Sequence, residues 1–143
     1  AYPEVHPQAR SAAADLEAFK RKVDAGANTA ITQFFFNADA YDHFVEAARK
    51  SGISIPIVPG IMPIASYSNL ARFAGNCGAE IPRWLSKRLE SFGDDTESIR
   101  AFGLDVVTAM CERLLKSGAP GLHFYTLNQA GLTTEIWQRL KLG

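Results

Sequence analysis

The sequence predicts an α/β fold made of repeated helix–strand units with parallel strands. Three times along the chain, an amphipathic helical pattern ends in a small residue followed by glycine, and an apolar run rich in β-branched and aromatic residues comes next. These runs are continuously apolar, which is typical of strands that are covered on both faces. A regular succession of helix, short loop and buried strand indicates βα units and a parallel sheet.

The helix ends carry the first of these observations. Gly26, Gly52 and Gly118 each follow a helical pattern directly. A glycine at this place adopts the left-handed conformation that closes the last helical turn, and a nearby lysine suits the negative end of the helix dipole. The strands expected after these glycines cover residues 30–36, 53–61 and 121–127, and residues 1–2 form an extended stub.

The helical patterns between these runs have apolar faces at the i, i+3, i+4 and i+7 spacing of an amphipathic helix. The residues expected on these faces are Leu16, Phe19 and Val23; Tyr41, Phe44, Val45 and Ala48; Leu70, Phe73 and Ala74; Trp84, Leu85 and Leu89; and Ile99, Phe102, Val106, Met110 and Leu114. Ser66, Pro82, and either Asp95 or Thr96 are expected to begin the last three of these five helices. A short helix around Ile136, Trp137 and Leu140 ends the chain.

The 143 residues are expected to form a single unit rather than two domains. Parallel strands joined by helices form either an open doubly wound sheet or a closed barrel. A closed barrel needs eight strands and usually about 200 residues or more, so three strands and a stub amount to half of one. The chain also starts at a strand end without an initiator methionine, which suggests a fragment.

The composition excludes several classes of protein. Fifteen acidic residues balance fifteen basic ones, which argues against a general binder of nucleic acid or of membrane surfaces. The sequence has neither a run of about 20 apolar residues nor a recognisable secretory signal. Cys77 and Cys111 form no CxxC pair and are interpreted as packing residues, which fits a reducing, cytoplasmic location.

Familiar cofactor motifs are absent from the sequence. It has no GxGxxG or GxxxxGK[ST] string, no HExxH or GxSxG string, and no cluster of Cys and His at metal-binding spacing. A dinucleotide would therefore have to bind by another route, and no metal site is predicted.

Polar residues at strand ends are the candidates for chemistry, because α/β barrels bind ligands at the carboxyl ends of their strands. Gln33 interrupts an apolar run, and its amide needs a partner, either in the barrel wall or in a ligand. Tyr125 could be part of the core or a platform for a ligand, whereas His123 is interpreted as a hydrogen-bonded core residue. Tyr2 and His6 flank a proline-stiffened loop that either presents them to a ligand or merely connects two elements.

A basic cluster occupies residues 20–22, as Lys-Arg-Lys. Most charge runs of this kind are solvated helix faces, and binding of a phosphate is the other interpretation. Neither the cluster nor its spacing decides between them.

Five segments, in order and in spacing, resemble methylenetetrahydrofolate reductases. They read AYPEVHP at 1–7, KRKVDAGA at 20–27, ITQFFF at 31–36, PGIMP at 59–63 and HFYTLN at 123–128. The resemblance covers essentially the whole chain. It implies a (β/α)8 TIM barrel, of which this chain supplies about the last four βα units.

The resemblance also implies a reaction. In that family NAD(P)H reduces a bound FAD, and the reduced flavin passes hydride to 5,10-methylenetetrahydrofolate, giving 5-methyltetrahydrofolate for methionine biosynthesis. The family's general acid, a glutamate on the first strand, lies in the half that is missing here. No catalytic residue is therefore expected in this chain, which should be inactive alone.

The resemblance assigns site residues by position. The flavin contacts it implies are Tyr2, His6, Ala9, Asp15, Arg21 and Lys22. Gln33 corresponds to a residue that touches folate and nicotinamide, and Phe73 and Tyr125 to apolar or stacking contacts. Three positions depart from the family: Ala18 replaces an asparagine near the flavin, Asn69 a glutamine near the substrate, and Gln129 an arginine that could meet the glutamate tail of the folate.

The expected partners are the folate substrate, the amino-terminal half of the same barrel and further copies of the protein. An alternative is a non-catalytic half-barrel module that pairs its exposed strand edges with a partner chain. A third possibility, a different barrel enzyme with a phosphorylated ligand, would need loops unlike those of this chain.

Overall fold

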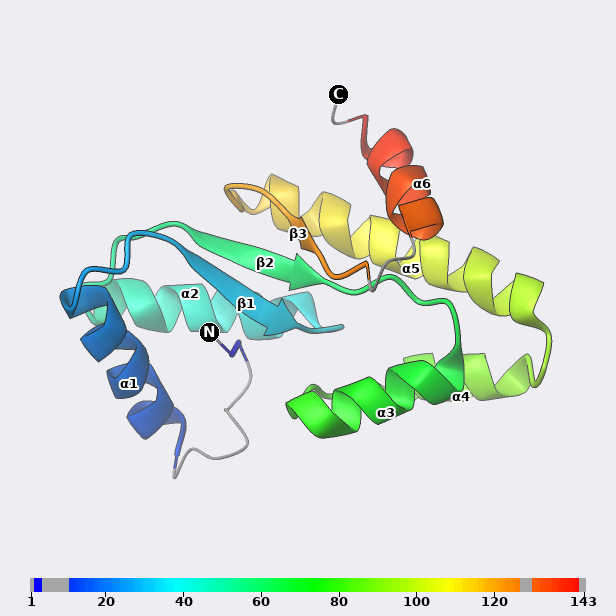
Figure 1. Cartoon of the computed structure of the whole chain (residues 1–143), viewed down its shortest axis with the longest axis horizontal. Coiled ribbons are helices and arrows are strands. Elements are labelled where there is room, and N and C mark those ends of the chain that lie inside the picture. The colour runs from blue at the N-terminus through cyan, green and yellow to red at the C-terminus, as the bar shows by residue number, and fades with distance from the viewer. Residues whose placement is uncertain (1, 4–10, 127–129, 142–143) are drawn as a thin grey trace.

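The computed structural model describes residues 2–3, 11–126 and 130–141, and in these it has three strands and six helices (Figure 1). Along the chain the elements are α1 (Ala12–Asp24), β1 (Ala30–Phe34), α2 (Ala38–Lys50), β2 (Ile57–Ile61), α3 (Tyr67–Cys77), α4 (Arg83–Ser91), α5 (Thr96–Lys116), β3 (His123–Phe124) and α6 (Ala130–Leu140). Figure 1 shows α1 at one end of an elongated molecule and α4 with the start of α5 at the other. The sheet and α2 lie between these ends, and α5 runs back from α4 toward β3.

The three strands form one parallel sheet in the order β1-β2-β3. Ala30 pairs with Ile57, and Gly60 pairs with His123. A helical connection joins each strand to the next. The expected α/β fold with parallel strands is therefore confirmed, whereas the closed barrel stays a prediction, because three strands do not close one.

The strands are shorter than expected, and the expectations for 30–36, 53–61 and 121–127 were wrong at their ends. The guanidinium of Arg49 donates to the carbonyl oxygens of Ile53 and Ile55 at 2.8 and 3.0 Å, so this segment bonds to α2 and only Ile57 begins the strand. Tyr2 is not part of a strand, and the strand expected over residues 121–127 is reduced to two residues, with Leu127 outside the described residues.

The predicted helix ends are confirmed. Gly26, Gly52 and Gly118 have φ angles of 121°, 85° and 98°, in the left-handed region that closes a helix. Ser66 caps α3, and Asp95 caps α5 by accepting the N–H of Ser98, so Thr96 is the first helical residue and not the cap. Hydrogen bonding to Ser98 also holds the pKa of the Asp95 carboxyl below its usual value.

The core lies between the sheet, α2 and α5. Phe35 is fully buried and stacks on Tyr41 of α2 with ring centroids 5.8 Å apart. The Tyr41 hydroxyl donates to the carbonyl oxygen of Ile57 at 2.6 Å, which ties α2 to β2. Each fully buried side chain of this size stabilises the fold by roughly 1.5–3 kcal/mol, so the packing of α2 on the sheet contributes to the stability of the fold.

The expected apolar face of α5 was partly wrong. Phe102 and Val106 are only half-buried, whereas Leu104, Val107 and Cys111 are buried. The reason is that α5 packs against both β2 and α6, so it buries two faces instead of one stripe. Burial raises the pKa of the Cys111 thiol to about 12, in keeping with a packing residue.

Both tryptophans are more exposed than their helical positions suggested. The exposed fraction is 57% for Trp84 in α4 and 47% for Trp137 in α6. Leu85 and Leu89 of α4 and Ile136 of α6 are buried as expected. No helix in the described part of the chain combines the length and the apolar character needed to cross a membrane.

Two helical glycines should respond in opposite directions to alanine. A Cβ on Gly103 of α5 would lie 2.7 Å from Cβ of Ile64, whereas one on Gly75 of α3 would meet nothing within 4 Å. We expect Gly103→Ala to lower the free energy of unfolding by about 1–3 kcal/mol through overpacking. Gly75→Ala should raise it by roughly 0.5–1 kcal/mol through helix propensity. Denaturant unfolding of both variants checks this, and a stabilised Gly103→Ala protein would contradict the packing of α5 on Ile64.

Candidate functional site

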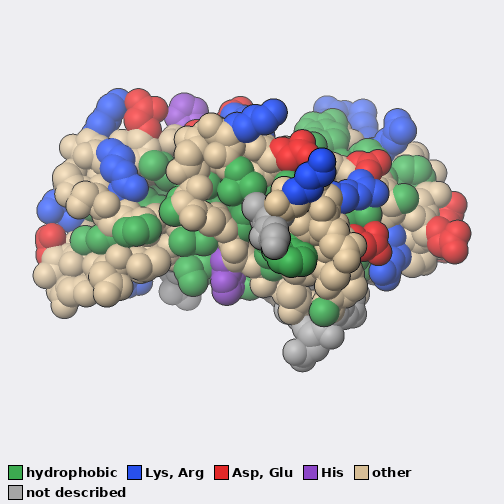
Figure 2. Space-filling model, turned by 90° about the horizontal axis from the view of Figure 1, so that it is seen from above, with side chains coloured by type: hydrophobic (Ala, Val, Ile, Leu, Met, Phe, Trp, Pro, Cys, Tyr) green, Lys and Arg blue, Asp and Glu red, His purple; other side chains and the backbone are tan. Residues whose placement is uncertain are grey.

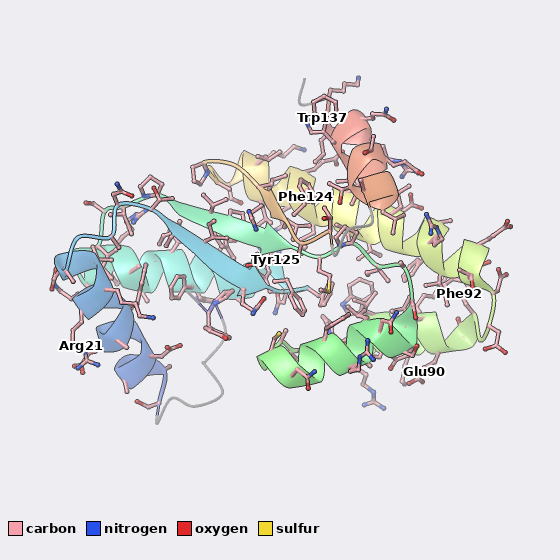
Figure 3. The ribbon with its side chains drawn as sticks, viewed as in Figure 1. Arg21, Glu90, Phe92, Phe124, Tyr125 and Trp137 are labelled. Carbon is pink, nitrogen blue, oxygen red and sulfur yellow. The ribbon has the colours of Figure 1, made fainter. Side chains whose placement is uncertain are left out.

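The carboxyl ends of the parallel strands meet at one edge of the sheet, and predicted site residues gather there. Gln33 belongs to β1 and Gly60 to β2, while Tyr125 directly follows β3. The backbone N–H of Tyr125 donates to the carbonyl oxygen of Ile61 at 2.8 Å, which extends the pairing of β2 and β3. Figure 3 shows Tyr125 beside the ends of β1 and β2. This is the edge at which α/β proteins bind ligands.

The side chain of Tyr125 crosses β2 at Gly60 and reaches β1. Its hydroxyl donates a hydrogen bond to the carbonyl oxygen of Thr32 at 2.9 Å. A Cβ on Gly60 would lie 2.7 Å from the Tyr125 ring and closer still to that carbonyl oxygen, so only glycine leaves room for this crossing. Phe34 and His123 meet the ring edge-on, with centroids 6.3 and 4.9 Å away. Tyr125 is thus fixed by residues of all three strands.

The environment of Tyr125 keeps its phenol protonated. Burial raises the pKa of Tyr125 above its usual value, and the neighbouring Cys77 and Tyr2 raise it further. Because the neutral phenol is favoured in the folded protein, the hydroxyl remains a hydrogen-bond donor throughout the neutral pH range.

A small pocket lies between α3 and Tyr125. Phe73 and Asn69 of α3 line it together with Tyr125, and its volume is about 70 Å³. Sites for small molecules usually hold about 300–1,000 Å³, so this pocket can take only the edge of a larger ligand. The structure brings Phe73 and Tyr125 together, as the resemblance implies, and places the departing residue Asn69 beside them.

Gln33 is half-buried, and one of the two polar atoms of its carboxamide forms a hydrogen bond. Its Oε1 accepts the N–H of Phe34 at 3.1 Å. Among the residues that the structure describes, the amide nitrogen has no partner. Of the two interpretations left open for Gln33, a partner in the wall accounts for the oxygen, and the nitrogen remains as a donor.

Several of the expected flavin contacts surround a second hollow, between α1 and β1. Tyr2, Asp15 and Lys22 line it, and so does Ala18, whose methyl group cannot form the hydrogen bond of the asparagine it replaces. The hollow holds about 300 Å³. An aromatic ring, a carboxylate and an ammonium group around one hollow can together meet a ring, ribose hydroxyls and a phosphate.

Of the other expected flavin contacts, only Arg21 is among the described residues, and it does not line this hollow. Arg21 is exposed, and Figure 3 shows its side chain extending outward from α1, away from the sheet. His6 and Ala9 lie outside the described residues, as does Gln129. Lys20 forms an ion pair with Asp24 at 3.4 Å, so the basic cluster divides into a paired lysine, an outward arginine and Lys22 at the hollow.

Sequence reasoning missed two residues of this edge, Thr32 and Gly60. Thr32 is fully buried and Gly60 contacts both Thr32 and Tyr125. A threonine and a glycine in apolar runs carry no chemical signal of their own, so only the pairing of β1 with β2 shows their role. Within the described residues no cluster of three or more His, Cys, Asp and Glu side chains is suited to a metal ion.

Comparison with known proteins gives the same family over nearly the whole chain. The family model for methylenetetrahydrofolate reductase matches residues 1–141. The 5,10-methylenetetrahydrofolate reductase of Escherichia coli is 42% identical over 140 residues, which are 98% of this chain and 47% of that protein. A probable methylenetetrahydrofolate reductase (NADPH) of Caenorhabditis elegans is 44% identical over 142 residues, 99% of this chain and 21% of that protein. The chain thus spans about half the length of the bacterial relative and a smaller share of the nematode relative.

A solved structure shares the fold. It is that of an uncharacterized protein from Clostridium thermocellum that binds two copies of 5-methyl-5,6,7,8-tetrahydrofolic acid, and it matches with a TM-score of 0.63 at 20% identity. The match covers 99% of this chain and 51% of that protein. At this identity the likeness concerns the fold alone. With the family model matched over residues 1–141, the chain belongs to the methylenetetrahydrofolate reductase family.

Proposed function

We propose that this chain is part of a flavin-dependent enzyme that reduces 5,10-methylenetetrahydrofolate to 5-methyltetrahydrofolate with NAD(P)H. The relatives that carry the reductase name are about twice as long or longer, so the active protein would include a further half of a TIM barrel. In that protein, which would act in the cytoplasm as a homo-oligomer, the present residues bind and orient the reactants. The chain alone would be inactive.

The observation that carries the proposal is that the two candidate regions adjoin. Ala30 and Ile31 of β1 line the hollow beside α1, and the Tyr125 hydroxyl donates to the carbonyl oxygen of Thr32, the next residue of the same strand. A flavin at the hollow and a folate at Tyr125 would therefore be neighbours, as hydride transfer between them requires. The folate bound by the Clostridium thermocellum protein of the same fold agrees with this assignment.

The residues at the hollow fit an FAD cofactor by their chemistry. Lys22 would meet a phosphate or a ribose oxygen, Asp15 would accept from a hydroxyl, and Tyr2 would cover a ring. His6, Ala9 and Arg21 are included in the proposed cofactor site on the resemblance. When bound, the flavin would supply the redox chemistry that no side chain can provide.

The residues at the sheet edge would hold the folate. Tyr125 and Phe73 offer aromatic surfaces on the two sides of one pocket, and stacking of a flat ring contributes roughly 0.5–1.5 kcal/mol beyond its burial. The amide nitrogen of Gln33 would donate to the pterin or to the nicotinamide. The Tyr125 hydroxyl is held by β1, so it orients the ring and is not a proton donor to the substrate.

Exchange of one lysine tests the cofactor assignment. In the full-length protein, Lys22→Ala should raise the dissociation constant of FAD roughly 10- to 100-fold, because a hydrogen bond to a charged group contributes about 1.5–3 kcal/mol. Lys20→Ala is the matched control, since Lys20 lies on the same helix but is paired with Asp24 and should bind FAD normally. Flavin absorbance after dialysis gives the measurement.

Two results would count against the proposal. Equal flavin retention by Lys22→Ala and the wild-type protein would remove the hollow beside α1 from the cofactor site. A full-length protein that binds neither flavin nor folate would favour the non-catalytic module that pairs with a partner chain.

A further inference from the structure

β1 contains an irregularity next to the proposed folate site. Ile31 pairs with Val58, but Phe34 pairs with Gly60, so two residues of β1, Thr32 and Gln33, stand opposite the single residue Pro59. This is a β-bulge, which places one extra residue in a strand and turns its side chains out of the regular alternation. Pro59 has no N–H and cannot donate to β1 at this point. The bulge therefore needs another source of hydrogen bonds.

Thr32 supplies those hydrogen bonds. Its hydroxyl accepts the N–H of Gly60 and donates to the carbonyl oxygen of Gln33, both at 2.9 Å. Its own carbonyl oxygen accepts the hydroxyl of Tyr125 at 2.9 Å. One residue thus links β2, the bulge and the ring that follows β3. Thr32 is fully buried, so it does this without touching a ligand.

These bonds fix the backbone on both sides of Gln33. The Thr32 hydroxyl holds the carbonyl group of Gln33, and the Gln33 side chain in turn holds the N–H of Phe34. The half-buried carboxamide is then left with its nitrogen as the group that can donate to a ligand. Thr32 also determines where Tyr125 lies, because its carbonyl oxygen accepts the hydroxyl of Tyr125.

We propose that Thr32 is a positioning residue, which holds Gln33 and Tyr125 in place through the bulge of β1. The proposal rests on the function proposed above, in which those two side chains contact the folate. Valine in place of threonine keeps the shape but removes the hydroxyl, and serine keeps the hydroxyl. Thr32→Val and Thr32→Ser therefore separate the hydrogen bonds from packing.

The first measurement does not depend on the function. Amide hydrogen exchange in the full-length protein should show Gly60 exchanging at least roughly tenfold faster in Thr32→Val, because its hydrogen bond is lost, and at a near-normal rate in Thr32→Ser. The amide of Tyr125, which donates to Ile61, is the internal control and should stay protected. Unchanged exchange at Gly60 in Thr32→Val would overturn the proposed role of Thr32.

The second measurement concerns the reaction. Thr32→Val should slow reoxidation of the reduced flavin by 5,10-methylenetetrahydrofolate roughly tenfold at an unchanged flavin content, as expected for one misplaced contact. Thr32→Ser should recover most of that rate. Valine keeps the Thr32 carbonyl group that holds Tyr125, so Thr32→Val removes only the bonds that act through Gln33. In the double variant Thr32→Val/Gln33→Ala the rate should therefore equal that of Gln33→Ala alone.

Failure of the positioning role and failure of the proposed function give different results. A rate loss in Thr32→Val that adds fully to that of Gln33→Ala, or that serine does not rescue, would mean a general loss of packing and would overturn the positioning role. Absence of flavin or of folate reduction in the wild-type protein would instead refute the proposed function. In that case the exchange rates at Gly60 would still decide whether Thr32 holds the bulge.

Discussion

Replacement of Gly60 by alanine is expected to lower the free energy of unfolding by about 3 kcal/mol and to detach Tyr125 from β1. The added Cβ would overlap the Tyr125 ring and the carbonyl oxygen of Thr32. The ring can move, but the carbonyl belongs to the neighbouring strand, so the sheet itself must shift. Overpacking usually costs about 1–3 kcal/mol, and a collision with backbone places this variant at the upper end.

Gly121→Ala is the matched control for this variant. Gly121 precedes β3, close in the chain to Tyr125, and a Cβ there would meet nothing within 4 Å. Denaturant unfolding should show a large loss for Gly60→Ala and little change for Gly121→Ala, and near-ultraviolet circular dichroism should show the altered tyrosine environment in the first variant alone. Equal stability of the two proteins would mean that Tyr125 does not cross β2 at Gly60.

The isolated chain of 143 residues is expected to show no detectable reductase activity and to associate with itself. β1 and β3 each have a second edge that no described strand pairs. Figure 2, which views the molecule from above, shows hydrophobic side chains along the middle of that face, and the exposed fraction of Ile31 on β1 is 44%. Unpaired strand edges beside apolar surface are templates for association.

Sedimentation velocity at several concentrations tests this expectation. The mass should rise with concentration, and addition of a separately produced amino-terminal half should replace self-association with a one-to-one complex that regains folate reduction. A monomer at all concentrations with a cooperative thermal transition would contradict the half-barrel interpretation. Reductase activity of the isolated chain would contradict the proposal that residues outside this chain supply the general acid.

Local features of the fold could be predicted from the sequence because their causes are local. Gly26, Gly52 and Gly118 end helices by backbone conformation. Ser66 begins a helix by accepting the N–H three residues later, and Asp95, one of two candidates, does the same. The strand beginning at Ile57 could not be placed this way, because the Arg49 guanidinium takes up the carbonyl groups of Ile53 and Ile55. A hydrogen bond of this kind depends on which side chain lies near the backbone, and the run of hydrophobic residues does not indicate it.

Some residues of the candidate site could likewise be predicted from the sequence, and others could not. Gln33 and Tyr125 stand out because a polar group at the carboxyl end of an apolar strand needs a reason, and the structure places both at one edge of the sheet. Thr32 gives no such signal, since its role arises only where the bulge sets it opposite Pro59. The exposure of Trp84 was also missed. Helical periodicity predicts which residues share a face of the helix, but it does not predict whether another element packs on that face.

The hydrogen bond between Tyr125 and Thr32 joins residues 93 positions apart in the chain. Closing so long a loop is entropically costly, so contacts of this kind usually form after local helices and after neighbouring strands have paired. The proposed ligand-binding edge would then be completed only in the last stage of folding. A partly folded chain with native helices would lack this edge, and the proposed binding of folate would therefore report on complete folding and not on helix content.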